Sequence, residues 1–276
     1  MGLPLLDTSR LCIHTITHKP WSLEVALDHF AKNSIAGISV WQSAIEEIGA
    51  VQAGELLASY PIDVVSYVRG GFFAHPDPKK RVQAIRDNRI MLEEAAALHA
   101  PLLVLVCGAH PAQSLSESRD QIQEGIEALL PDAQKYGIKL GIEPLHPMYA
   151  DSRSAISTLR QALDMSLTIE SPMVGVVIDV YHLWWDDQLA FEIKRCGIEN
   201  RIFAFHICDW KSPTTDILLD RGLMGEGCIE IKRIRNMVED AGFLGYIEVE
   251  IFSNIYWQMD QEEFLQRIIA AYLQQS

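Results

Sequence analysis

The sequence predicts an α/β protein that forms a single (β/α)₈, or TIM, barrel over residues 1–276. Short, nearly continuous apolar runs alternate with stretches whose apolar residues recur every three or four positions, as expected of buried parallel strands and amphipathic helices. The chain length of 276 residues also suits such a barrel. A doubly wound open sheet is the alternative, but the GxGxxG turn typical of it does not occur.

Eight strands are expected because each run is apolar enough to be buried on both faces: Leu11–Thr15, Gly37–Trp41, Ile62–Tyr67, Leu102–Cys107, Lys139–Glu143, Val174–Asp179, Ile202–Ile207 and Tyr246–Ile251. The helical spacing predicts helices over Trp21–Asn33, Ala44–Ser59, Lys79–His99, Ser116–Tyr136, Arg153–Leu163, Ile229–Ala241 and Gln261–Leu273, with a short one near Asp187–Arg195. Capping boxes are expected at Ser43 with Glu46 and at Ser114 with Glu117. No linker or low-complexity segment divides the chain, which favours one domain.

Composition narrows the range of partners. The formal net charge of −14 opposes binding to the phosphate backbone of a nucleic acid. No run of 18 apolar residues and no basic start with an apolar core occur, so neither a membrane span nor a signal peptide is expected. The five cysteines are odd in number and form no CxxC pair, which indicates reduced thiols in a cytoplasmic protein.

Charged residues stand at the ends of four predicted strands. Glu143, Asp179, His206 and Glu250 each lie at or just beyond the end of an apolar run. In a parallel barrel these ends converge on one mouth, where such barrels keep their chemistry. Charged groups resist burial unless they are paired or bind a metal, and oxygen ligands with one imidazole suit a divalent ion. We therefore expect one bound ion, Mn²⁺ first, with Mg²⁺, Co²⁺ or Zn²⁺ as alternatives.

Other residues are expected around this mouth. His14 lies at the end of the first strand, Trp41 ends the second, and His146 follows the fifth, positions that suit hydroxyl recognition and stacking on a sugar. Glu248 points to the same face of its strand as Glu250, because side chains two residues apart lie on one side. Glu250 is preferred as the ligand because it is nearer the strand end, whereas Glu248 is expected to pair deeper in the barrel with a basic or hydroxyl group.

Four motifs carry a resemblance to a known family: GIEPLHP (141–147), VIDVYH (177–182), FHICDW (205–210) and VEIFS (249–253). They resemble the metal-site motifs of the xylose-isomerase-like barrel superfamily, which includes sugar (phosphate) isomerases and epimerases, inosose dehydratases and type IV apurinic endonucleases. The resemblance runs from about the fourth strand to the eighth and fits the layout of the whole chain.

The resemblance implies a role for each matching residue. The implied metal ligands are Glu143, Asp179, His206 and Glu250. The two glutamates are also implied to act as the opposing acid and base. His182 is implied to hydrogen-bond a substrate oxygen. Arg221 matches an arginine that helps to hold substrate, but it comes fifteen residues after His206, whereas many epimerases have it only a few residues after that histidine.

The implied function is a metal-dependent isomerase or epimerase of a sugar or polyol that moves a proton next to a carbonyl through an enediolate. An inosose dehydratase or 3-keto-sugar lyase is the alternative on the same site. A non-catalytic sugar-binding barrel and an apurinic endonuclease rank lower, the endonuclease because of the negative charge. By analogy with several such families, the chain is expected to form a homo-oligomer.

Overall fold

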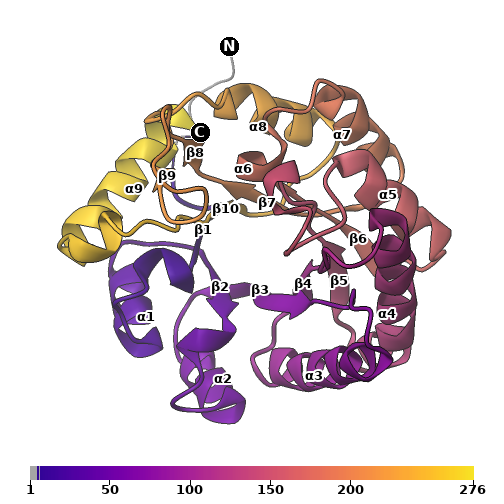
Figure 1. Ribbon diagram of the computed structural model, residues 1–276. Helices are drawn as coiled ribbons and strands as arrows, with labels where there is room; N and C mark the ends of the chain where they lie inside the picture. The colour runs from indigo at the N-terminus through magenta and orange to yellow at the C-terminus, as the bar shows by residue number, and fades with distance from the viewer. Residues whose placement is uncertain (1–4, 6) are drawn as a thin grey trace.

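A computed structural model describes residue 5 and residues 7–276 of the chain. Eight parallel strands close into a barrel in the order β1-β10-β7-β6-β5-β4-β3-β2, and the longer helices form a ring around it (Figure 1). Each barrel strand pairs with its neighbours in sequence among the barrel strands, apart from the closing pair β1 and β10. The predicted fold class is confirmed.

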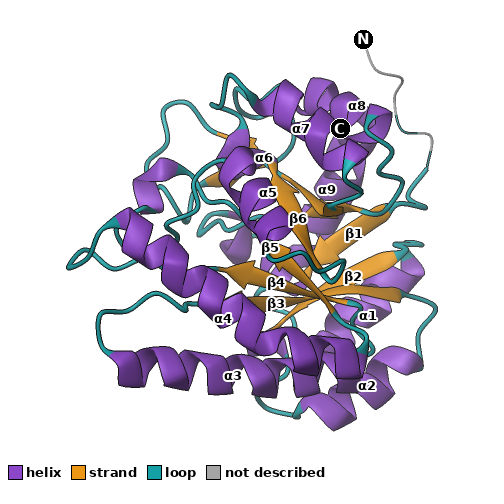
Figure 2. Ribbon diagram, turned by 90° about the vertical axis from the view of Figure 1, so that its right-hand side faces the viewer, coloured by secondary structure: helices purple, strands orange, loops and turns teal. Residues whose placement is uncertain are grey.

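The bounds of the elements follow the predicted runs closely. The barrel strands are β1 Leu11–His14, β2 Gly37–Trp41, β3 Asp63–Gly71, β4 Leu102–Val106, β5 Lys139–Ile142, β6 Val174–Asp179, β7 Ile202–Ile207 and β10 Ile247–Val249. A separate antiparallel hairpin joins β8 Asp209–Trp210 to β9 Arg221–Gly222. The helices are α1 Leu23–Lys32, α2 Ala50–Ala58, α3 Pro78–Ala97, α4 Leu115–Tyr136, α5 Leu159–Thr168, α6 Val180–Leu183, α7 Leu189–Ile198, α8 Ile231–Asp240 and α9 Gln261–Gln275. In the side view of Figure 2 the helices flank the twisted strands on the outside.

Helix starts were predicted less well than strands. The capping box of Ser114 and Glu117 is present at the start of α4. The one at Ser43 is wrong, because residues 42–44 form a 3₁₀ turn and α2 begins only at Ala50. The helix expected from Arg153 begins at Leu159 instead, since the preceding residues pair with Gly108 after β4. Tertiary pairing overrides local helical preference there.

The core has an outer and an inner part. Most buried apolar side chains form one large cluster, while a smaller cluster contains Val68, Leu102, Val104, Val177 and Ala204. Asp179 and His206 lie two residues beyond Val177 and Ala204, and therefore face the same side of their strands. The barrel interior is thus apolar lower down and polar at the C-terminal ends of these strands.

Within the described residues, no helix combines the length and the apolar character needed to cross a membrane. All five cysteines are free thiols, and all but Cys228 are buried. The expectation of unpaired cysteines is confirmed.

Candidate metal centre

Four ionisable side chains meet at the C-terminal end of the barrel. Glu143 follows β5, Asp179 ends β6, His206 lies in β7 and Glu250 follows β10. One ligand atom from each lies within 4.8 Å of those of the other three. None of the four residues is more than 5% exposed. The structure therefore brings together the whole set that the sequence pointed to.

Neighbouring strands place the first three side chains. Asp179 and His206 are register partners across β6 and β7, so both project from one level of the barrel. The backbone N–H of Glu143 donates to Leu105 O at 3.1 Å, which extends the β4–β5 pairing by one residue. Each side chain is thereby fixed by main-chain hydrogen bonds.

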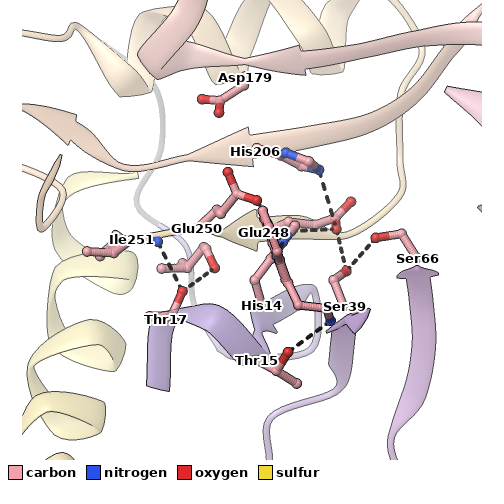
Figure 3. A network of polar contacts seen from close by, with 12 residues as sticks. His14, Thr15, Thr17, Ser39, Ser66, Asp179, His206, Glu248, Glu250 and Ile251 are labelled. Carbon is pink, nitrogen blue, oxygen red and sulfur yellow. Dashed lines mark hydrogen bonds and ion pairs between the residues drawn. The ribbon is translucent and has the colours of Figure 1, made fainter. Parts of the chain in front are cut away.

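Glu250 is held by contacts on both sides of it. Its own N–H donates to Ile207 O at 3.2 Å. The Thr17 hydroxyl donates to Val249 O at 3.1 Å and accepts from Ile251 N–H at 3.0 Å (Figure 3). Thr17, which follows β1, thus clamps the backbone on either side of the carboxylate.

Two buried polar atoms of the site have no hydrogen-bond partner among the described residues and are placed to bind a cation. Glu143 Oε1 and His206 Nδ1 lie 3.2 Å apart, yet both are buried and neither makes a hydrogen bond. Buried polar atoms in proteins are nearly always satisfied. Two ligand atoms that each lie about 2.0–2.2 Å from one ion can be about 4.0–4.4 Å apart. The ligand atoms of this cluster are separated by little more than that. Glu143, Asp179, His206 and Glu250 therefore form a donor set that suits a divalent ion.

The carboxylates differ in their proton affinity. Burial raises the pKa of Asp179 to about 7, although the positive charge of Arg221 acts in the opposite direction. Burial also disfavours the charged form of Glu250, but His14 and Arg221 hold its pKa well below its usual range. Glu250 is thus held as a carboxylate, whereas Asp179 is only partly ionised near neutral pH even with Arg221 beside it.

Arg221 is the positively charged residue that lies beside both carboxylates. Its Nη1 lies 2.9 Å from Glu250 Oε2 and 3.3 Å from Asp179 Oδ2, and the residue is 3% exposed. The guanidinium also lies over the rings of Tyr181 and Phe252. The hairpin β8–β9 returns the chain to the barrel mouth, which is how an arginine so far from His206 in sequence reaches the cluster.

His182 lies beside Arg221, and His146 in turn contacts His182. His182 is 3% exposed, with its Nε2 3.3 Å from Arg221 Nη2 and 3.7 Å from Asp179 Oδ2. Burial and the charge of Arg221 lower the pKa of His182 well below its ordinary value, which keeps the ring neutral. The backbone N–H of His146 donates to His182 Nδ1 at 3.3 Å, and its half-buried ring packs against Trp210. Both histidines flank the cluster.

His14 and Trp41 lie on the opposite side of Glu250. His14 is fully buried, with Nδ1 3.1 Å from Glu250 Oε1 and Nε2 3.1 Å from Glu248 Oε2. Trp41 Nε1–H donates to His14 Nδ1 at 3.2 Å. Burial opposes a charge on His14, but Glu250 and Glu248 raise its pKa. The structure therefore shows His14 engaged by protein groups at both ring nitrogens.

Glu248 lies one level deeper than Glu250 and is 1% exposed. Its Oε2 accepts from Ser39 Oγ at 2.6 Å and contacts His14 Nε2 (Figure 3). His206 Nε2 is 3.6 Å from the same oxygen. Burial disfavours a charge on His206, but Glu248 and then Glu143 raise its pKa to about 10. Glu248 thus has the basic and hydroxyl partners expected for it.

Sequence reasoning missed Ser39, Ser66 and Thr17. Ser66 Oγ donates to Ser39 Oγ at 2.9 Å, in register across β2 and β3. For the two serines, the sequence signal was a hydroxyl residue that interrupts an apolar run. Asp209 lies close to His206 in sequence, but its carboxylate accepts backbone N–H groups of the loop after β9, including those of Gly225 and Gly227.

Comparison with known proteins agrees with this geometry. The family model described as xylose isomerase-like TIM barrel matches residues 18–272. An inosose isomerase of Bacillus licheniformis is 26% identical over 196 residues, covering 70% of this chain and 68% of that protein. Protein SMc04130 of Sinorhizobium meliloti 1021 has a solved structure with a TM-score of 0.93 and 42% identity, covering 96% of this chain and 98% of that chain. The IOLI protein, whose crystal structure has a bound zinc atom, has a TM-score of 0.83 and 22% identity, with 95% and 96% of the two chains covered. The chain belongs to the xylose isomerase-like TIM barrel family.

Proposed function

We propose that this protein is a divalent-metal-dependent isomerase or epimerase that acts on a small sugar or polyol. One observation carries the proposal: Glu143, Asp179, His206 and Glu250 converge within 4.8 Å in a buried site, with the facing atoms of Glu143 and His206 left without hydrogen bonds. The Bacillus licheniformis relative is named an inosose isomerase, which supports a cyclic polyol ketone as the substrate class.

The four residues would hold the ion, which supplies a Lewis acid that polarises a carbonyl and offsets the charge of an enediolate. Glu143 and Glu250 act as the two proton-transfer groups. They lie on strands separated by β6 and β7, so they approach a bound substrate from different directions. Glu250, kept ionised by His14 and Arg221, removes the proton next to the carbonyl, and Glu143, which enters this step protonated, donates its own proton to the enediolate. Exchange with solvent then restores both groups.

Return of the proton to the other face of the same carbon gives epimerisation, and return to the neighbouring carbon gives isomerisation. His182 and Arg221 are proposed to hold substrate oxygens, with His14, His146 and Trp41 as the remaining residues near the substrate. A cavity of about 500 Å³ lies where β2 and β3 end and is lined in part by Trp41 and Arg69, although none of the four candidate ligands lines it. Its volume is within the size range of small-ligand pockets.

An inosose dehydratase or 3-keto-sugar lyase is the second candidate. The same proton abstraction followed by loss of a β-oxygen substituent would give this outcome, and the buried neutral His182 is a group able to donate a hydrogen bond to a leaving oxygen. An endonuclease is disfavoured because the net charge of −14 repels a phosphate backbone.

We further propose Mn²⁺ as the resident ion, with Mg²⁺, Co²⁺ and Zn²⁺ as alternatives, and a cytoplasmic homo-oligomer as the working form. The zinc atom of the IOLI protein supports a metal in this fold. The free thiols suit a reducing compartment. Elemental analysis of the protein purified from its own cells tests the ion, and light scattering tests the oligomer, which a monomeric mass would refute.

The experiment is a screen of ketoses and inososes in D₂O with each candidate ion, followed by NMR and mass spectrometry. An isomerase or epimerase gives a product of conserved formula with deuterium at the carbon that was deprotonated. Loss of water or of an alcohol would favour the dehydratase or lyase instead. No exchange with any substrate, in protein shown to bind the ion, would contradict the proposal.

A further inference from the structure

A carboxylate that is not among the four candidate ligands contacts both histidines of the site. Glu248 Oε2 lies at a hydrogen-bond distance of 3.1 Å from His14 Nε2 and at an ion-pair distance of 3.6 Å from His206 Nε2, which makes no hydrogen bond within the described part of the chain. The other nitrogen of each ring faces a candidate ligand: His14 Nδ1 faces Glu250, and His206 Nδ1 faces Glu143. Figure 3 shows Glu248 between the two rings.

Glu248 lies deeper in the barrel than Glu250 and is almost fully buried. Its register partners are Cys12 on β1 and His206 on β7, one level below Glu250. It is 1% exposed, and its Oε2 also accepts from Ser39, which Ser66 supports from β3. Any effect of this carboxylate on the reaction must therefore pass through the residues it touches.

We infer that Glu248 is a positioning residue that keeps a proton on Nε2 of His206 and so presents Nδ1 of that ring to the metal, while it holds His14 against Glu250. A metal-bound imidazole commonly donates its other N–H to a carboxylate, which fixes the tautomer and the ring orientation. The inference rests on the proposed metal-dependent function and adds the group that sets the geometry of its histidine ligand.

The contacts favour this role over a second metal site. One ligand atom each from His14, His206 and Glu248 also lie within 4.8 Å of one another. However, Glu248 Oε2 already takes the Ser39 hydroxyl at 2.6 Å, and His14 Nε2 points at the same oxygen. An acceptor surrounded by donors is satisfied without a cation.

The test compares metal binding by the wild type and by Glu248→Met, which keeps an unbranched side chain but removes the acceptor. Protein stripped with a chelator is titrated by calorimetry with Zn²⁺ and, in a second series, with Mn²⁺. We expect a loss of affinity of about 10- to 100-fold, the usual effect of removing such a partner. Glu248→Gln retains one acceptor oxygen, so its metal affinity should lie between those of the wild type and Glu248→Met. This second variant keeps the test valid if the methionine variant does not fold.

The matched control is Glu192, another buried carboxylate, replaced in the same two ways. Glu192 is 2% exposed and pairs with Arg195 at 2.6 Å on α7, outside the barrel. Its variants should bind Zn²⁺ with affinity within about threefold of the wild type, well short of the 10-fold loss expected of a lost partner.

A spectroscopic readout separates positioning from general damage. In zinc-loaded protein labelled with ¹⁵N-histidine, the His206 ring should show a protonated Nε2 and a metal-bound Nδ1. In Glu248→Met this pattern should be lost or divided between two tautomers, while the Glu192 variants keep it.

The outcomes are distinguishable. Absence of Zn²⁺ and Mn²⁺ binding by the wild type would overturn the proposed function and this inference with it. Binding by the wild type with unchanged affinity and unchanged ¹⁵N shifts in Glu248→Met would overturn the inference alone. Two ions per wild-type chain and one in Glu248→Met would make Glu248 a ligand, and would also overturn it.

Discussion

Replacing Arg221 with methionine removes the buried guanidinium that lies against two candidate ligands. Its Nη1 is 2.9 Å from Glu250 and 3.3 Å from Asp179, and all three residues are at most 4% exposed. Removal of one member of a buried ion pair costs about 3–5 kcal/mol, because the remaining charges stay buried without a partner.

That cost converts into a melting temperature. With an unfolding entropy of about 2.1 cal/mol/K per residue, a chain of 276 residues has about 0.6 kcal/mol/K in total. Arg221→Met should therefore lower the Tm of metal-free protein by about 5–9 °C. At pH 8, above the pKa of Asp179 of about 7, both carboxylates are ionised in the wild type and the full effect is expected.

A divalent ion should restore much of the lost Tm, because it neutralises the two carboxylates in place of the guanidinium. An ion at 100 times its Kd adds about 2.7 kcal/mol, or about 5 °C. The shift should be larger in Arg221→Met than in the wild type, where ion and guanidinium approach the same carboxylates.

The assay is differential scanning calorimetry with chelator and with excess Mn²⁺. Arg89→Met is the control, because its pair with Asp132 at 2.9 Å is on the surface and should change the Tm by less than about 2 °C. A drop of less than about 2 °C for Arg221→Met, or a metal-induced shift no larger than that of the wild type, would refute the reasoning.

Further predictions concern the site, pH dependence and a helix cap. Glu143→Gln and Glu250→Gln should each abolish turnover of the substrate found in the screen, because each removes a group that transfers a proton and weakens a metal ligand; full activity in either variant would contradict the assigned roles. Burial lowers the pKa of His18 to about 4, so its neutral ring stabilises the fold above pH 6.5 and that contribution is lost as the pH falls from 6.5 to 4. At pH 5 the free energy of unfolding is lower by about 2 kcal/mol because of this ring. Between pH 7 and pH 5, the Tm of His18→Gln should therefore fall by about 3 °C less than the Tm of the wild type. Equal falls in Tm would contradict the lowered pKa of His18. Ser114→Ala removes a capping box and should cost about 1 kcal/mol, or less than about 2 °C by calorimetry, so a loss above 5 °C would mean that Ser114 does more than cap α4.

The barrel and the four candidate ligands were readable from the sequence for a physical reason. A strand buried on both faces must be apolar along its length, so each carboxylate or imidazole that ends such a run stands out. Parallel strands then bring those ends to one side of the barrel. Asp179 and His206 in particular needed only the strand assignments to be placed together.

Contacts between distant segments were not readable in the same way. Serine interrupts many strands without consequence, so nothing marked Ser39 and Ser66 as the hydroxyls beneath Glu248. The reach of Arg221 depends on the β8–β9 hairpin, whose two-residue strands leave little pattern. The start of α2 at Ala50 follows Gly49 in a positive-φ conformation, which overrode the capping signal at Ser43.

The central claim is that Glu143, Asp179, His206 and Glu250 bind one divalent ion. The most direct test is the metal content per chain of the wild type and of His206→Ala, by elemental analysis after metal supplementation and dialysis. The claim predicts one ion per wild-type chain, and a clear loss in the variant. No ion in the wild type, or equal content in both proteins, would contradict it, and about three ions per chain would favour the endonuclease chemistry that the charge opposes.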